Sequence, residues 1–129
     1  MVNSITVLEL SLKNNLDIGD HLLLGEALRP LRGEGVLIVG SGYSTHSPDI
    51  SDDDRRRFMS WFHDVLTNET YSPETRKQLL LNSHREPTLS SAHPRTEHFL
   101  PSLVVCAAAS YRPGTVLHEE PSLSHVKFD

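Results

Sequence analysis

The chain has 129 residues, of which 37% are hydrophobic and 22% charged, and this is enough for one globular domain with a core of its own. The formal net charge of -5 at neutral pH argues against nucleic acid or an anionic membrane as the main partner. Neither a membrane-spanning run of roughly 20 apolar residues nor a signal peptide is visible, and a single cysteine excludes an internal disulfide, so we expect one cytoplasmic domain over residues 1–129.

The first third of the sequence predicts a strand, a helix and a second strand. Residues 5–12 (ITVLELSL) are rich in β-forming residues and leucine, which indicates a mostly buried strand. Residues 17–32 carry leucine and alanine at helical spacing, with Asp17 or Asp20 as the N-cap. Residues 36–39 (VLIV) are a short apolar run typical of a strand covered on both faces. This βαβ order predicts two adjacent parallel strands in an α/β fold, with the loop after the second strand placed where such sheets bind ligands.

The remainder of the sequence predicts three further helices and two short strands. Ser51 is the expected N-cap of a helix whose first turn holds three aspartates, Asp52 to Asp54. A third helix begins at Pro73 and ends near Asn82. A polar loop is expected over residues 83–94 and a fourth helix over residues 97–110. Two short terminal strands are expected over residues 114–117 and 123–128.

A glycine-flanked turn after the second expected strand presents a histidine, in the segment GVLIVGSGYSTHS over residues 35–47. Glycines there permit positive φ and a close approach of a ligand to the backbone, and histidine is a frequent metal ligand and acid/base near neutral pH. From spacing alone, a functional His46 and a surface turn with an incidental histidine are both open. A phosphate cradle is not favoured, because the turn lacks the third glycine and the lysine of the nucleotide-binding motifs.

A second segment, AHPRTEHFLP over residues 92–101, leads from the polar loop into the fourth expected helix. We expect Glu97 and His98 in the first turn of that helix, where rigid backbone would present a ligand. The alternative is a surface histidine near a helix cap, and the spacing of this segment leaves both interpretations open.

Together, VLIVGSGxxxH and AHPxxEHFLP, with the two histidines about fifty residues apart, resemble the DOPA-type extradiol dioxygenases of the class III (LigB) superfamily. Residues 10–12 and 25–32 resemble the family's segment before the glycine turn, and residues 122–129 resemble its C-terminal strand. The resemblance implies a three-layer α/β fold with parallel strands and flanking helices, of which this chain is the C-terminal half.

The resemblance also implies roles for three histidines. His98 matches a ligand of the active-site metal, and His46 matches the acid/base near the substrate, which is sometimes also a metal contact. His93 matches a less universal histidine that we assign to substrate binding. The implied cofactor is non-haem Fe(II), with zinc as the alternative, and the implied reaction is the opening of a catechol- or DOPA-type ring by O2.

The sequence also departs from this family. Full members are roughly twice as long, and two further metal-binding histidines lie in HGSP-like and SAHW-like segments that are missing from these 129 residues. We therefore expect the chain to need a complementing chain or a homo-oligomer for activity, because protein-bound metals normally have three or four protein donors. The alternatives are a piece of a longer gene product, or a degenerate relative that acts as a weak metal-binding or protein-interaction module.

Overall fold

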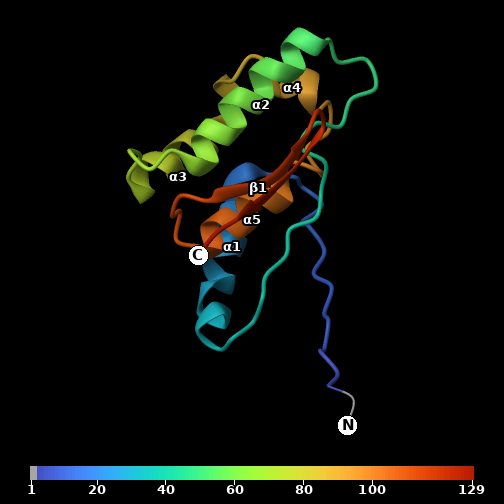
Figure 1. Ribbon diagram of the computed structural model, residues 1–129. Helices are drawn as coiled ribbons and strands as arrows, with labels where there is room; N and C mark the ends of the chain where they lie inside the picture. The colour runs from blue at the N-terminus through green and yellow to red at the C-terminus, as the bar shows by residue number, and fades with distance from the viewer. Residues whose placement is uncertain (1–2) are drawn as a thin grey trace.

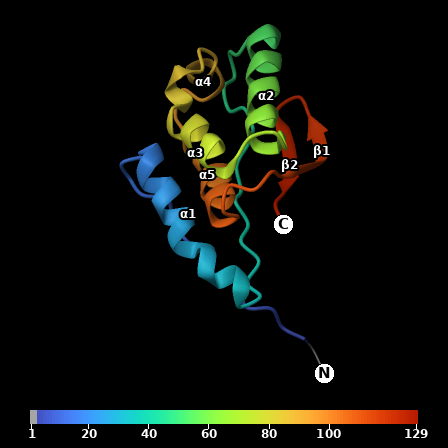
Figure 2. The same ribbon diagram turned by 90° about the vertical axis from the view of Figure 1, so that its left-hand side faces the viewer.

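The computed structural model describes residues 3–129, which fold as a layered arrangement of helices with one β-hairpin (Figure 1). The elements in chain order are α1 (Ile18–Gly33), α2 (Asp52–Thr67), α3 (Pro73–Leu81), η1 (Ser83–Arg85), α4 (Leu89–Ala92), α5 (Leu100–Ala108), β1 (Thr115–Glu120) and β2 (Leu123–Lys127). Figure 2 shows α1 on one side, α5 and α3 in the middle, and α2 with the hairpin on the other side. Within residues 3–129, no helix combines the length and apolarity needed to cross a membrane.

Side-chain caps fix the starts of the three long helices. The Asp17 side chain accepts a hydrogen bond from the Asp20 N–H, which identifies the cap of α1. The Ser51 side chain accepts a hydrogen bond from the Asp54 N–H at the start of α2. The Ser72 side chain accepts one from the Thr75 N–H at the start of α3. Each cap satisfies an N–H that has no partner inside its helix. The predicted starts of these helices are confirmed.

The core lies where α1, α2, α3 and α5 meet. Phe58 and Phe62 of α2 and Leu103 of α5 are fully or almost fully buried within it. The helices α1 and α5 touch at Gly25, where an added Cβ would lie 2.3 Å from the Val104 carbonyl oxygen. Only glycine permits this approach, so a larger residue at position 25 would push the two helices apart.

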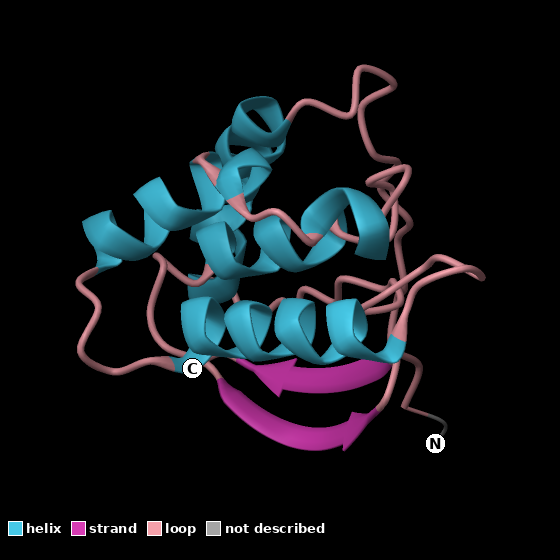
Figure 3. Ribbon diagram, turned by 90° about the horizontal axis from the view of Figure 1, so that it is seen from above, coloured by secondary structure: helices cyan, strands magenta, loops and turns pink. Residues whose placement is uncertain are grey.

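The sheet differs from the one that the sequence predicts. The two terminal strands are confirmed: β1 and β2 pair antiparallel, with Val116 opposite Val126, and form a curved ribbon along one edge of the molecule (Figure 3). The prediction of two adjacent parallel strands over residues 5–12 and 36–39 is wrong for the described chain. Both segments are extended, but neither belongs to a sheet, and the described chain forms one two-stranded sheet. Residues 3–129 thus form a mixture of helices and a small antiparallel sheet, and the expected three-layer arrangement with parallel strands is not seen in them.

Two further boundaries differ from the prediction. The expected polar loop over residues 83–94 contains the short helices η1 and α4. The fourth long helix begins at Leu100, so Glu97 and His98 lie in the turn before it. The N–H groups of Phe99 and Leu100 both bond to the Thr96 carbonyl, which closes that turn. Pro101 lacks an N–H and fits the start of a helix, where this group has no intrahelical partner.

Candidate functional site

The structure brings His46 and His98 side by side. Their ring centroids are 3.9 Å apart with an interplanar angle of 38°. The Tyr43 ring lies next to both, 5.9 Å from His46 and 5.7 Å from His98. His46 is exposed and His98 is half-buried, so the pair is open to solvent on one side. Two segments about fifty residues apart in the sequence therefore meet at their histidines.

Backbone contacts hold the glycine-rich loop against the turn that carries His98. The His46 N–H donates to the Ala92 carbonyl oxygen at 2.8 Å. The Tyr43 N–H donates to Nδ1 of His98 at 3.3 Å. At Gly42, an added Cβ would lie 2.3 Å from the His98 carbonyl oxygen, so a larger residue would push the two segments apart. The position of His46 relative to His98 is thus set mainly by backbone packing.

The C-terminal hairpin also supports this loop. The Ser44 hydroxyl lies 2.9 Å from the Ser124 hydroxyl and accepts a hydrogen bond from the Ser124 N–H at 2.9 Å. The N–H groups of Ser44 and Thr45 both approach the Ser122 carbonyl, at 3.1 Å and 3.3 Å. Ser44 and Thr45 are buried, and sequence reasoning missed both because a buried serine or threonine in a loop leaves no periodic signal.

His93 lies beneath the loop and is 2% exposed. Its Nε2 is 2.8 Å from the Ser44 carbonyl oxygen; a carbonyl can only accept, so Nε2 carries the proton. Its ring packs against Phe58 at 5.3 Å and Phe99 at 5.5 Å, while Nδ1 is buried without a partner. Burial lowers the pKa of His93 from 6.5 to about 4. In this conformation His93 positions the loop and does not face the open side of the site.

We expect a His93→Gln variant to lose much of the acid sensitivity of the fold. The unfolded chain takes up a proton at His93 as the pH falls through 6.5, whereas the folded chain resists protonation down to about pH 4. The unfolded state binds more protons than the folded state in this window. Lowering the pH from 7.5 to 4.5 therefore reduces the free energy of unfolding by about 2–3 kcal/mol through His93. Urea unfolding at the two pH values measures the change. His84→Gln, at an exposed position, should keep the wild-type drop; an unchanged drop in His93→Gln would contradict the assignment.

Residues 3–129 do not make a complete metal site. Among residues 3–129, no three His, Cys, Asp or Glu side chains gather closely enough to hold an ion. The carboxylate of Glu97, next to His98 in sequence, is paired with Arg95 at 2.7 Å. A metal-bound histidine normally donates its second N–H to an acceptor, but Nδ1 of His98 faces the donor N–H of Tyr43. The chain offers two neighbouring imidazoles, and His98 must change its tautomer and lose the hydrogen bond from the Tyr43 N–H before Nε2 can bind a metal.

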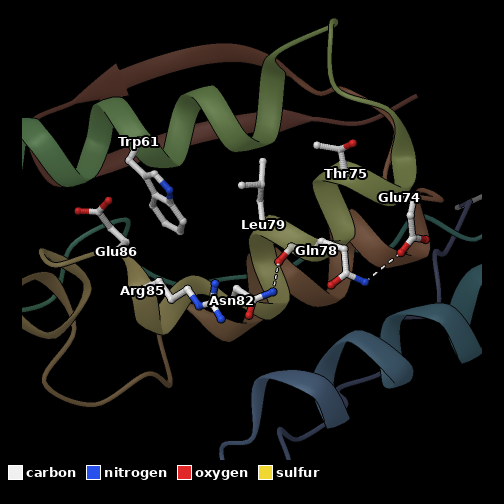
Figure 4. A pocket seen from close by; sticks show the side chains of 8 residues that line it. All are labelled: Trp61, Glu74, Thr75, Gln78, Leu79, Asn82, Arg85 and Glu86. Atoms are coloured by element: carbon white, nitrogen blue, oxygen red, sulfur yellow. Dashed lines mark hydrogen bonds between the residues drawn. The ribbon is translucent and has the colours of Figure 1, made fainter.

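A hollow with a volume of about 500 Å³ lies elsewhere, between α2, α3 and η1 (Figure 4). The residues that line it are Trp61, Glu74, Thr75, Gln78, Leu79, Asn82, Arg85 and Glu86. Two of its amides are already engaged: Gln78 donates to Glu74 at 2.9 Å, and Asn82 donates to the Gln78 carbonyl at 2.8 Å. Its lining contains no histidine, so it is separate from the His46–His98 pair.

Three curated proteins named 4,5-DOPA dioxygenase extradiol are similar to the chain. The protein from Beta vulgaris is 39% identical over 112 residues, which cover 81% of this chain and 40% of the relative. The protein from Portulaca grandiflora is 35% identical over 114 residues, which cover 81% of this chain and 40% of the relative. The protein from Mirabilis jalapa is 31% identical over 121 residues, which cover 88% of this chain and 43% of the relative. The chain thus spans about two fifths of the length of these relatives. No family model and no solved structure matches it significantly.

Proposed function

Because the chain is a partial relative of the extradiol DOPA dioxygenases, we propose that it supplies part of the active site of an aromatic ring-opening dioxygenase. The proposal depends on one observation above the others, the 3.9 Å separation of the His46 and His98 rings. The relatives are enzymes by name, and the chain matches two fifths of their length, so the rest of the site would lie outside these residues. We further propose that the complete protein has the parallel LigB-like fold and acts in the cytoplasm.

Three histidines have distinct roles in this proposal. His98 binds the metal, together with donors from outside this chain. His46 moves protons at the substrate, with a contact to the metal as a second role. His93 supports substrate binding by holding the loop through its bond to Ser44. The substrate is a catechol of the DOPA type, and Fe(II), with zinc as the alternative, supplies the centre at which this substrate and O2 react.

The surroundings of His46 suit proton transfer. Its backbone N–H donates to the Ala92 carbonyl, which holds the residue next to His98, while its side chain is exposed to solvent. Imidazole changes charge near neutral pH and can take a proton from a catechol hydroxyl and return it later. The Tyr43 ring lies beside both histidines and is 52% exposed, so it can contact a planar substrate.

A second function is favoured by the incomplete donor set. Residues 3–129 gather fewer than three metal donors in one place. By itself, the chain would therefore act as a non-catalytic relative that binds metal weakly or works through contact with another protein. Metal content separates the two: a dioxygenase part binds iron tightly once its missing donors are present, and a degenerate relative does not.

The test compares the isolated chain with a reconstituted pair, which is this chain co-expressed with the part of the Beta vulgaris relative that it does not match. We expect the isolated chain to show little or no cleavage of DOPA with Fe(II) and O2, and the pair to bind about one iron and to form the yellow ring-opened product. Strong cleavage by the isolated chain would contradict the need for outside donors. A soluble pair without bound iron would support the non-catalytic relative.

A further inference from the structure

Most exposed apolar side chains of the structure lie in its two extended segments, residues 3–12 and 36–43. The described chain has eleven large hydrophobic side chains that are exposed, and eight of them belong to these segments: Ile5, Val7, Leu8, Leu10, Val36, Leu37, Val39 and Tyr43. Neither segment pairs with a strand, and the one two-stranded sheet of the described residues lies at the hairpin. Extended backbone with free hydrogen-bonding groups and apolar side chains is the usual template for adding a strand.

The segment over residues 36–43 has one covered face and one open face. An added Cβ at Gly40 would lie 2.6 Å from the Pro101 carbonyl oxygen, so this side of the segment rests on α5. Leu37 and Val39, two residues apart, are 85% and 75% exposed. Side chains of extended backbone alternate between two faces. The segment is therefore extended chain that packs on α5 on one face only, and between its bonded ends, the N–H groups of Val36 and Tyr43, it pairs with no strand.

We propose that residues 3–12 and 36–43 are edge strands that pair with strands of the part of the dioxygenase fold that this chain does not span. The inference rests on the proposed function and names the partner that completes the same site. The partner is a polypeptide corresponding to the unmatched three fifths of the relatives, present either in a longer chain or as a separate one. It would cover the open apolar face of Leu37 and Val39.

The position of the histidines favours this partner. Residues 36–43 lead directly to His46, and the Tyr43 N–H contacts His98. A parallel neighbour of this strand ends at the same edge of the sheet, so its loop would bring new donors beside His98.

A second copy of this chain does not meet the same need. Two identical edges related by a two-fold axis pair antiparallel, so the two His46 loops would lie at opposite ends of the paired strands. Each site would keep two histidines and no third donor. The open edges therefore fit the missing part of the fold better than they fit a second copy.

The experiment uses the reconstituted pair and two matched variants. Sedimentation should show a one-to-one complex, and hydrogen exchange should show amides of residues 5–10 and 37–41 protected in the pair and unprotected in the isolated chain. Val39→Lys should raise the Kd by roughly tenfold or more, because it places a charge in an apolar interface. Leu117→Lys, at a residue of β1 that is 64% exposed, should leave the Kd unchanged.

Other results would overturn the inference. If both lysine variants bind equally well, or if the amides of residues 37–41 stay unprotected in the complex, these segments are not the docking edges. A tight homodimer of the isolated chain that Val39→Lys dissociates would make the second copy the occupant. His98→Ala separates the two proposals: it should abolish iron binding and leave the complex intact. A complex that forms with protected edges but binds no iron supports the docking and removes the proposed function.

Discussion

Replacing Arg76 with leucine should lower the free energy of unfolding by about 3–5 kcal/mol. Arg76 is completely buried in the described fold. Its guanidinium donates to three backbone carbonyls: Val65 at 2.8 Å, Tyr111 at 2.7 Å, and Asn68. Val65 and Asn68 lie at the end of α2, where carbonyls have no partner within the helix. Leucine would fill part of the volume but would leave these acceptors unsatisfied.

Urea unfolding at pH 7.5 measures this difference. The matched control is Arg57→Leu, because Arg57 is exposed on α2 and should change the free energy by less than about 0.5 kcal/mol. Arg76→Lys keeps the charge but lacks the planar fork that reaches three carbonyls, so it should also destabilise the fold strongly. An Arg76→Leu chain as stable as the wild type would mean that water or a rearranged α2 end satisfies the carbonyls.

The helices are predictable from the sequence because their signals are local. Ser51 and Ser72 each bond to an N–H three residues further along, so the pattern that predicts each helix start is the contact itself. The start of α5 is less predictable, because the turn closed by the Thr96 carbonyl competes with helix over the same residues. Glu97 and His98 directly precede residues that form α5, but they lie in the turn before that helix.

The parallel strands are not realised, because strand pairing depends on a partner and not on the strand alone. Residues 5–12 and 36–39 have the composition of buried strands, but in the structure neither is a strand and most of their apolar side chains are exposed, so the predicted burial is wrong for the described residues. Pairing requires a neighbouring strand in register, and the described residues supply strands only in the terminal hairpin.

The candidate site is predicted in part. The pairing of His46 with His98 follows from a family resemblance that joins two distant segments, and the geometry agrees with it. The burial of His93 and the support from Ser44 come from tertiary contacts that no spacing reveals. Tyr43 also escapes sequence reasoning, although its position directly after the Gly-Ser-Gly turn places it beside both histidines.

In the reconstituted pair, His98→Ala and His46→Ala should fail in different ways. His98→Ala should remove bound iron and turnover together, because it deletes one of a small number of donors and metal sites rarely tolerate such a loss. His46→Ala should retain most of the iron and slow turnover by about 10²–10⁴, the usual contribution of a general acid/base. Iron content by elemental analysis and initial rates with DOPA measure the two effects on the same samples.

The difference between the two variants tests whether His98 binds the metal and His46 moves protons. His84→Ala, at an exposed histidine of η1, should match the wild-type pair in both measurements. If His46→Ala loses iron as completely as His98→Ala, then His46 is a metal ligand and the proton role belongs to another group. If iron binds equally well without His98, the ligand assignment is wrong. A rate loss in His46→Ala that added imidazole restores would identify the missing group as a proton carrier, because free imidazole can replace a base but cannot rebuild the packing of a side chain.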